Sequence, residues 1–257
     1  MNIKTMIHQP PKVRPATCEK HGAFEAKCHL SDIWTKCPHC AQDERQAAEA
    51  LEQARKRDQT LREWQARIGQ SGIPERFQER TLDTFVAGSD AQRYALTFAK
   101  AFADNFEQVI KTGRSAMFIG KPGTGKTHLA AGIGLQIMRE QRRSVLFTTV
   151  MRAVRRVKDS WSRDNPENEG KAIASMVFPD LLILDEVGVQ FGSEFEKNIL
   201  FDVLNERYEK RRPVLLLSNL HKDDVTGYLG ERIVDRLRED GGKLIPFTWE
   251  SHRGRAA

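Results

Sequence analysis

The fold is decided by residues 120–127, which read Gly-Lys-Pro-Gly-Thr-Gly-Lys-Thr. They match the phosphate-binding loop G-x-x-x-x-G-K-[ST] at every required position. The apolar run 116–119 precedes the loop and the helix-like stretch 128–133 follows it, which is the setting that such a loop requires. Glycines let the backbone wrap a phosphate closely, and the helix start adds a partial positive charge. The stretch therefore predicts a nucleoside triphosphate site, which we take to be for ATP.

The loop residues share the task of holding the phosphates and their magnesium ion. Lys126 is expected to reach the β- and γ-phosphate oxygens, and Thr127 is expected to offer its hydroxyl to Mg²⁺. The residues that we expect to contact the nucleotide within the loop are Gly120, Pro122, Gly123, Thr124, Gly125, Lys126 and Thr127.

A second acidic element follows at residues 181–186, Leu-Leu-Ile-Leu-Asp-Glu. Its apolar run is typical of a strand that is buried on both faces of a parallel sheet. Asp185 would complete the Mg²⁺ shell, and Glu186 would orient and deprotonate the attacking water. A helix cap is the alternative for these two carboxylates, and their pairing with the phosphate loop argues against it.

The composition predicts a globular protein of the cytoplasm. The chain has 257 residues, of which 39% are hydrophobic and 30% are charged. We find no apolar stretch of about 20 residues that could span a bilayer, and the first fifteen residues lack the apolar core of a signal peptide. The net charge of +6 mildly favours an anionic partner. We therefore expect no membrane partner.

Four cysteines lie within the first forty residues, and three of them belong to two tight pairs, one with His21 and one formed by two cysteines. Cys18 and His21 are three positions apart, as are Cys37 and Cys40, which is the spacing of a zinc knuckle. Together they would make a closed tetrahedral Zn²⁺ site, with a small hairpin between the pairs carrying Phe24 and Trp34. Cys28 is the competitor of His21 for the fourth position, and reduced cysteines without a metal are the remaining alternative.

The character of the chain changes after Cys40. Residues 41–68 form a run without glycine or proline that is rich in Ala, Glu, Gln and Arg, which predicts one long polar helix. Residues 70–74, Gln-Ser-Gly-Ile-Pro, break it. We therefore predict an N-terminal module at 1–70 and a second domain at 71–257.

The second domain alternates between helix-like and strand-like segments. The expected helices are 90–112, 125–141, 150–163, 193–211 and 222–227, and the expected strands are 116–119, 144–149, 181–185, 213–218 and 243–248. Such alternation predicts an α/β fold with a parallel sheet flanked by helices, and a ligand site at the carboxyl ends of the strands.

Four motifs in order carry a resemblance to a known family. GKPGTGKTHLAAGIG, LLILDEVGVQ, RRPVLLLSNL and LGERIVDRL, preceded by the stretch from Ser71 to Phe85, resemble the DnaC/IstB group of AAA+ ATPases. The resemblance covers about 71–257. It implies an AAA+ P-loop NTPase fold with a very short lid, because few residues follow Asn219.

The resemblance also implies roles for three further residues. Asn219 matches the sensor-1 residue that orients the attacking water. Arg236 matches an arginine finger that enters the site of a neighbouring subunit, and Arg253 matches the sensor-2 arginine that contacts nucleotide. The finger implies self-association into a spiral oligomer. The alternatives are an ordinary turn for Asn219 and a solvated basic helix face for Arg236.

A basic helix follows the second strand of the second domain. It carries Arg152, Arg155, Arg156 and Lys158, and the first three share a face by their spacing. By resemblance this helix would contact single-stranded DNA, through salt-sensitive phosphate contacts. A solvated basic face is the alternative.

Three classes of function remain open at this point. The first is an ATP-dependent loader that places the replicative DNA helicase on single-stranded DNA, with residues 1–70 binding the helicase. The second is an IstB-like ATPase that assists a transposase, where the cysteine pairs are unexpected. The third is a nucleic-acid-binding zinc protein without catalysis, against which the intact Lys126, Asp185 and Glu186 argue.

Overall fold

The computed structural model describes residues 11–28, 33–162, 164–188 and 193–252. The chain divides into two compact units, Met1–Glu63 and Trp64–Ala257, which are described separately below. No helix in the described ranges has both the length and the apolar character that a bilayer span needs.

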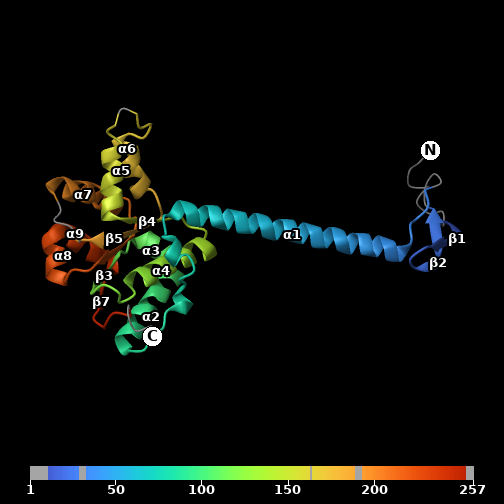
Figure 1. The fold of residues 1–257 in the computed structure, drawn as a ribbon, viewed down its shortest axis with the longest axis horizontal. Helices are drawn as coiled ribbons and strands as arrows, with labels where there is room; N and C mark the ends of the chain where they lie inside the picture. The colour runs from blue at the N-terminus through green and yellow to red at the C-terminus, as the bar shows by residue number, and fades with distance from the viewer. Residues whose placement is uncertain (1–10, 29–32, 163, 189–192, 253–257) are drawn as a thin grey trace. The chain divides into compact units, whose positions relative to one another are not determined.

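A parallel five-stranded sheet forms the centre of the second unit (Figure 1). Its strands, in chain order, are β3 (Ala116–Gly120), β4 (Val145–Thr149), β5 (Leu181–Val187), β6 (Val214–Ser218) and β7 (Lys243–Phe247). Their order across the sheet is β4-β5-β6-β3-β7, so β4 and β7 are its edges. Every pairing is parallel. The predicted parallel sheet is therefore confirmed, and each strand lies within two residues of its expected bounds.

Helices cover both faces of this sheet. One face packs against α2 (Asp90–Asp104), α3 (Phe106–Thr112) and α4 (Lys126–Glu140). The other packs against α5 (Val150–Asp159), α6 (Glu169–Val177), α7 (Glu194–Glu209), α8 (Lys222–Leu229) and α9 (Glu231–Arg238). Short 3₁₀ turns lie at Glu75–Phe77, Leu82–Thr84 and Glu239–Gly241.

Alternation along the strands explains why both faces are covered. Ala116 and Phe118 of β3 belong to the first apolar core, whereas Met117 and Ile119 belong to the second. Successive side chains of a strand point to opposite faces, so a continuous apolar strand needs a helix layer on each side. The apolar run before the phosphate loop thus positions that loop at the carboxyl edge of a sheet buried on both faces.

The helices differ from expectation in four places, one of which is α9, because no helix at 231–238 was among those expected. The expected helix 90–112 is two helices, because Asn105 leaves the helical backbone conformation and its side chain donates to the carbonyl of Ala101. The expected helix 150–163 ends at Asp159. Helix α6 was not expected, although its N-cap Asn168 accepts from the amide of Lys171 as such caps do.

The first unit begins with an antiparallel hairpin, β1 (Lys12–Cys18) and β2 (Gly22–Cys28). The hairpin expected between the cysteine pairs is therefore displaced: the first pair lies in its turn, where Gly22 has φ 80. Phe24 lies on β2, while Trp34 follows it and forms an isolated bridge with Cys28.

Helix α1 (Pro38–Ser71) confirms the expected long helix and extends it at both ends. Its residues Trp64 and Ile68 belong to the second unit and pack in the first apolar core there. The expected domain boundary at residue 70 stays a prediction.

Candidate functional site

The phosphate loop joins β3 to α4 and has the backbone that its glycines allow. Gly120, Gly123 and Gly125 have φ values of 142, 78 and 95, which residues with a Cβ rarely adopt. A Cβ at Gly120 would lie 2.2 Å from the carbonyl oxygen of Phe247. The ammonium group of Lys126 crosses the loop and donates to the carbonyls of Gly120 at 2.6 Å and Lys121 at 2.8 Å. The loop is therefore preformed around a buried positive charge.

The strand β5 brings the first acidic residue to this loop. Thr127 Oγ1 donates to Asp185 Oδ2 at 3.1 Å, so the two side chains expected to share a magnesium ion are in contact. Burial raises the pKa of Asp185, while the Glu186 amide, the Thr127 hydroxyl and Lys126 act in the opposite direction. A hydroxyl and a carboxylate in contact at the edge of the phosphate loop are oxygen ligands of the kind that Mg²⁺ prefers. The donor set fits that ion.

Glu186 lies where the regular pairing of its strand is interrupted. The register of β5 against β6 shifts between Leu184 and Val187, which marks a bulge, and Glu186 has φ 62. Bulges re-aim side chains, and a non-glycine residue at positive φ stores strain of about 1 kcal/mol or more. The result is an exposed carboxylate next to Asp185, the expected magnesium ligand. Asn219 follows the neighbouring strand β6, also at the carboxyl end of the strands, and is exposed as well.

The segment after β7 is hydrogen-bonded to the phosphate loop. Trp249 Nε1 donates to the carbonyl of Thr124 at 2.9 Å, and the amide of His252 donates to the carbonyl of Gly123 at 3.0 Å. No helix follows β7 in the described part of the chain. Arg253 is the next residue and lies outside the described residues.

Arg236 lies at the amino-terminal ends of the strands, whereas the phosphate loop lies at their carboxyl ends. Its guanidinium donates to the side chain of Asn205 and stacks on the ring of Tyr208 at 4.6 Å. It lines a small hollow with Ser115 and Val214, which stand at the amino-terminal ends of β3 and β6. Within one chain, Arg236 is therefore separated from the phosphate loop by the length of a strand.

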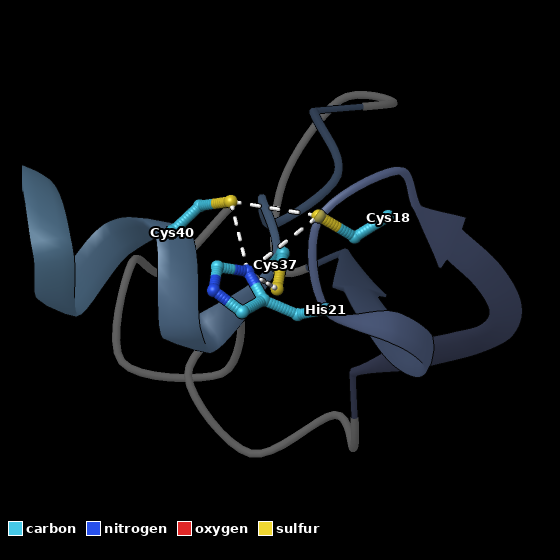
Figure 2. A group of neighbouring side chains, drawn as sticks. All are labelled: Cys18, His21, Cys37 and Cys40. Carbon is cyan, nitrogen blue, oxygen red and sulfur yellow. Dashed lines mark hydrogen bonds between the residues drawn. The ribbon is translucent and has the colours of Figure 1, made fainter.

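In the first unit, the structure brings Cys18, His21, Cys37 and Cys40 together (Figure 2). Four of the distances between their ligand atoms are 3.3 to 3.7 Å. A tetrahedral zinc ion with bonds of about 2.0 to 2.3 Å would place its ligand atoms roughly 3.5 to 3.8 Å apart. Cys28 is not part of the group; it is buried on β2. The donor set and its spacing fit zinc.

The surroundings of the four ligands suit a metal ion as well. Nδ1 of His21 faces the thiols, while its Nε2 lies 3.5 Å from Asp43 Oδ2, the arrangement by which a carboxylate orients a metal-bound imidazole. Backbone amides of Lys20 and His21 lower the pKa of the Cys18 thiol to about 6, whereas the hydrogen bond with Cys18 raises the pKa of Cys40 to about 11. A thiolate is the form that binds zinc.

Helix α5 exposes its basic side chains. Arg152, Arg155, Arg156 and Lys158 are all exposed, while Val150, Ala153, Val154 and Val157 are buried. They are not equivalent, however. Arg156 makes a two-pronged ion pair with Glu167 at 2.7 and 3.0 Å, and Lys158 lies over the ring of Phe195 at 5.3 Å.

An aromatic group beside α5 was missed from the sequence. Trp161 is 54% exposed and its ring lies 5.0 Å from that of Phe195. Exposed aromatic rings next to basic residues are the surface on which unpaired bases stack. Trp161 follows the basic helix directly, which was a usable signal, whereas Phe195 reaches it only through the fold.

Comparison with known proteins places the chain in a family. The model of the IstB-like ATP-binding proteins matches residues 50–255. The replicative helicase loader DnaC of Escherichia coli K12 is 33% identical over 202 residues, covering 79% of this chain and 80% of that protein. DnaC of Buchnera aphidicola from Acyrthosiphon pisum is 34% identical over 186 residues, with 72% and 74% covered.

Solved structures agree on the fold. The crystal structure of a DnaC helicase loader aligns with a TM-score of 0.60 at 23% identity, covering 67% of this chain and 99% of the other. DnaA bound to AMPPCP and single-stranded DNA aligns with a TM-score of 0.57 at 21% identity, covering 69% of this chain and 51% of the other. With its phosphate loop, acidic strand end and parallel sheet, the chain belongs to the IstB-like ATP-binding family, the DnaC/IstB group of AAA+ P-loop ATPases.

Proposed function

We propose that this protein acts in DNA replication by loading the replicative hexameric helicase onto single-stranded DNA under the control of ATP. The observation that carries the proposal is the contact between Thr127 and Asp185 beside Lys126. It joins the two residues that we propose as magnesium ligands, in a chain one third identical to proteins named replicative helicase loader. We further propose that it works in the cytoplasm, with its helicase.

In this proposal the nucleotide site hydrolyses ATP to ADP and phosphate. Lys126 and the loop amides bind the phosphates, and Glu186 accepts the proton of the attacking water. Magnesium, when held by Thr127 and Asp185, would supply positive charge to the phosphate oxygens. Asn219 orients the water from the neighbouring strand, and Arg253 contacts the nucleotide from the C-terminal tail.

The N-terminal module is the proposed contact with the helicase. Zinc held by Cys18, His21, Cys37 and Cys40 would stabilise the hairpin, which is too small to bury a substantial core of its own. The polar helix α1 then offers an exposed surface for a protein partner.

The second domain is the proposed contact with DNA and with other copies of the chain. The exposed cations of α5 and the Trp161–Phe195 pair would bind a single strand by phosphate contacts and stacking. Arg236 would reach the nucleotide of a neighbouring copy in a spiral oligomer, and ATP cleavage would loosen that contact and release the helicase.

A loading experiment tests this function. The full-length protein, ATP and the replicative helicase of the same cell are mixed with closed circular single-stranded DNA, and helicase bound to the circle is measured after gel filtration. A closed circle has no end to thread, so helicase should appear on it only with the parent protein. Lys126→Ala should fail because it lacks nucleotide, and His21→Ala should fail because it does not hold the helicase.

The same experiment also distinguishes the loader role from the alternative, IstB-like role. If the helicase is neither bound nor transferred, and the protein instead stimulates a transposase of its cell in an ATP-dependent manner, the IstB-like role replaces the loader role.

A further inference from the structure

A groove of about 400 Å³ lies at the amino-terminal end of the edge strand β4. Among the described residues, those that line it include four arginines, Arg67, Arg142, Arg143 and Arg156, and no carboxylate. The lining also includes the apolar residues Met138 and Leu146. The groove is therefore positively charged and partly apolar.

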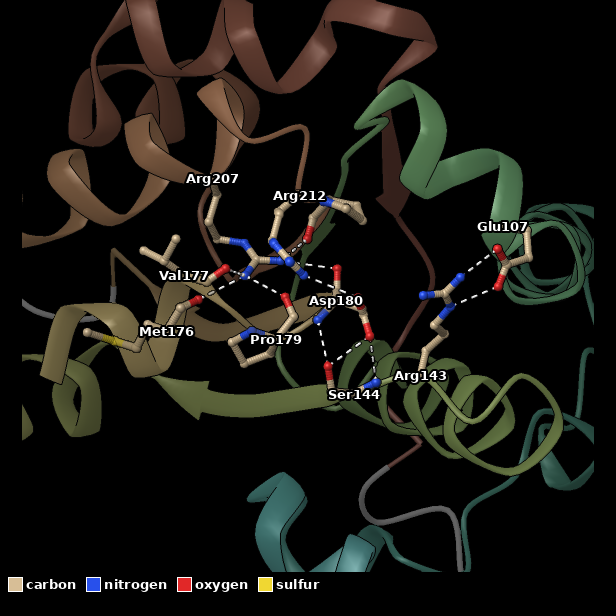
Figure 3. A network of polar contacts seen from close by, with 10 residues as sticks. Glu107, Arg143, Ser144, Met176, Val177, Pro179, Asp180, Arg207 and Arg212 are labelled. Atoms are coloured by element: carbon tan, nitrogen blue, oxygen red, sulfur yellow. Dashed lines mark hydrogen bonds and ion pairs between the residues drawn. The ribbon is translucent and has the colours of Figure 1, made fainter. Parts of the chain in front are cut away.

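Two of the four arginines already have carboxylate partners. Arg143 binds both carboxylate oxygens of Glu107, at 2.8 and 2.7 Å (Figure 3). Arg156 binds Glu167 in the same way. Arg67 donates only to the carbonyl of Met138, at 3.4 Å, and neither Arg67 nor Arg142 forms an ion pair within the described part of the chain. The uncompensated charge of the groove thus belongs to these two.

Asp180, which contacts the groove residue Ser144, is engaged elsewhere. Asp180 accepts from the amide and hydroxyl of Ser144 at 2.9 and 2.8 Å, and from Arg212 at 3.2 Å (Figure 3). These bonds anchor the loop before β4 without neutralising Arg142. Arg142 itself is exposed and has φ 55, a conformation that costs an arginine strain which glycine would avoid.

The groove continues the basic face of α5. The chain passes from the carboxyl end of β4 into α5, which runs back toward the amino-terminal edge of the sheet. Arg152 begins this face, and Arg156 lies one turn further along, about 6 Å by the rise of a helix. Because Arg156 also lines the groove, the two basic surfaces meet at its side chain.

We propose that this groove is a second phosphate-binding subsite, in which Arg67 and Arg142 hold the backbone of the DNA strand that α5 contacts. The inference rests on the proposed function and extends its DNA path around the edge of β4. Guanidinium groups bind phosphate in a two-pronged geometry. An acidic peptide would also match the positive charge of the groove. It would not account for the continuity between the groove and the basic face of α5.

Salt-dependent DNA binding tests the subsite in the full-length protein. Anisotropy of a fluorescent oligothymidylate is measured with ATP across a range of salt for Arg67→Gln, Arg142→Gln and the double variant. Removing one protein–phosphate interaction with a single strand lowers the salt slope by about 0.7, which at about 0.1 M salt weakens binding about fivefold. The double variant should therefore bind about 25-fold more weakly. Arg93→Gln, an exposed arginine of α2, is the control and should bind like the parent.

Two further arms separate the outcomes. Arg142→Gly removes the backbone strain together with the charge, so its melting temperature should be unchanged or higher while its DNA affinity falls. Affinities that fall only where melting temperatures fall would overturn the subsite. Arg152→Gln tests the α5 contact alone: if it weakens DNA binding and the groove variants do not, the subsite fails and the proposed function stands.

The remaining outcomes are decisive as well. If neither Arg152→Gln nor the groove variants weaken binding, the DNA path of the proposed function fails together with the subsite. If the groove variants keep their affinity for oligothymidylate but no longer bind polyglutamate, the groove is a site for an acidic peptide and the inference is wrong.

Discussion

Substitution of Arg207 should destabilise the second unit more than any other single arginine change that we can identify. Its side chain is fully buried, and its guanidinium donates to backbone carbonyls only (Figure 3). The five acceptors, at 2.7 to 3.3 Å, are those of Met176, Val177, Pro179, Asp180 and Pro213. The first two end α6, so the charge also offsets the negative end of a helix dipole. Burial lowers the pKa of Arg207 to about 9, which leaves it charged at neutral pH.

The magnitude follows from the acceptors that would be left without their donor. Each buried carbonyl left unsatisfied costs about 1 to 3 kcal/mol, and partial relaxation limits the sum. We therefore expect Arg207→Met to lower the free energy of unfolding by about 4 kcal/mol, the cost of about two such carbonyls. In a unit of this size that is roughly 10 to 15 °C in melting temperature. Arg207→Lys has three donors instead of five and should be destabilised about half as much.

Urea unfolding followed by circular dichroism measures these differences. Arg212→Met is the matched control, because Arg212 is partly exposed and its ion pair with Asp180 should contribute about 1 kcal/mol or less. Hydrogen exchange should localise the destabilisation to the start of β5 and the end of α6. An Arg207→Met protein within about 1 kcal/mol of the parent would refute the assignment of Arg207 as the donor that holds these carbonyls.

The remaining predictions concern the two sites and the acid stability of the fold. Lys126→Ala should abolish ATP binding, which equilibrium dialysis measures. Glu186→Gln should bind ATP like the parent but hydrolyse it at least 10²-fold more slowly, measured as phosphate release with DNA and helicase present. Parental turnover in the Gln variant would show that Glu186 is not the base. Elemental analysis should find one zinc per chain, retained in Cys28→Ser and absent from His21→Ala, and zinc-free parent protein would contradict the site. Arg143 lowers the pKa of Glu107 below its ordinary 4.5, so the pair stabilises the folded state above that pH and the contribution disappears as pH falls through the lowered value. Glu107→Gln should therefore flatten the acid side of a melting-temperature profile, and an unchanged profile would mean that the ion pair contributes nothing.

The core of the fold was predictable because its signals are local. The glycines and Lys126 of the phosphate loop directly follow an apolar strand in the sequence, so the whole motif can be recognised without the fold. The same holds for the apolar run ending at Asp185. A parallel sheet follows from alternation of such segments, since parallel strands need crossover helices. The cysteine pairs are local as well, and the structure brings both together with His21 as the fourth member.

What was missed depends on contacts between distant segments. Arg207 stands in the charged run Glu206–Arg212, which by sequence is a solvated helix end; it is buried because carbonyls from residues 176–180 meet it there. The bond from Trp249 to the phosphate loop has the same character. The break at Asn105 is different, because its side chain bonds locally to the carbonyl of Ala101. Composition and periodicity carry no information on such pairings.

The position of Arg236 has a consequence for how the ATPase must work. The arginine lies at the amino-terminal edge of the sheet, whereas the phosphate loop leaves the carboxyl end of β3. A five-residue strand spans about 16 Å at its usual rise, while a guanidinium must come within about 3 Å of a phosphate oxygen to bind it. Arg236 therefore cannot serve the nucleotide of its own chain without unfolding α9. Its contacts with Asn205 and Tyr208 keep it on α7, the helix that follows the strand carrying Glu186. If Arg236 acts in hydrolysis, it acts on another copy, and its position there depends on its contacts with α7.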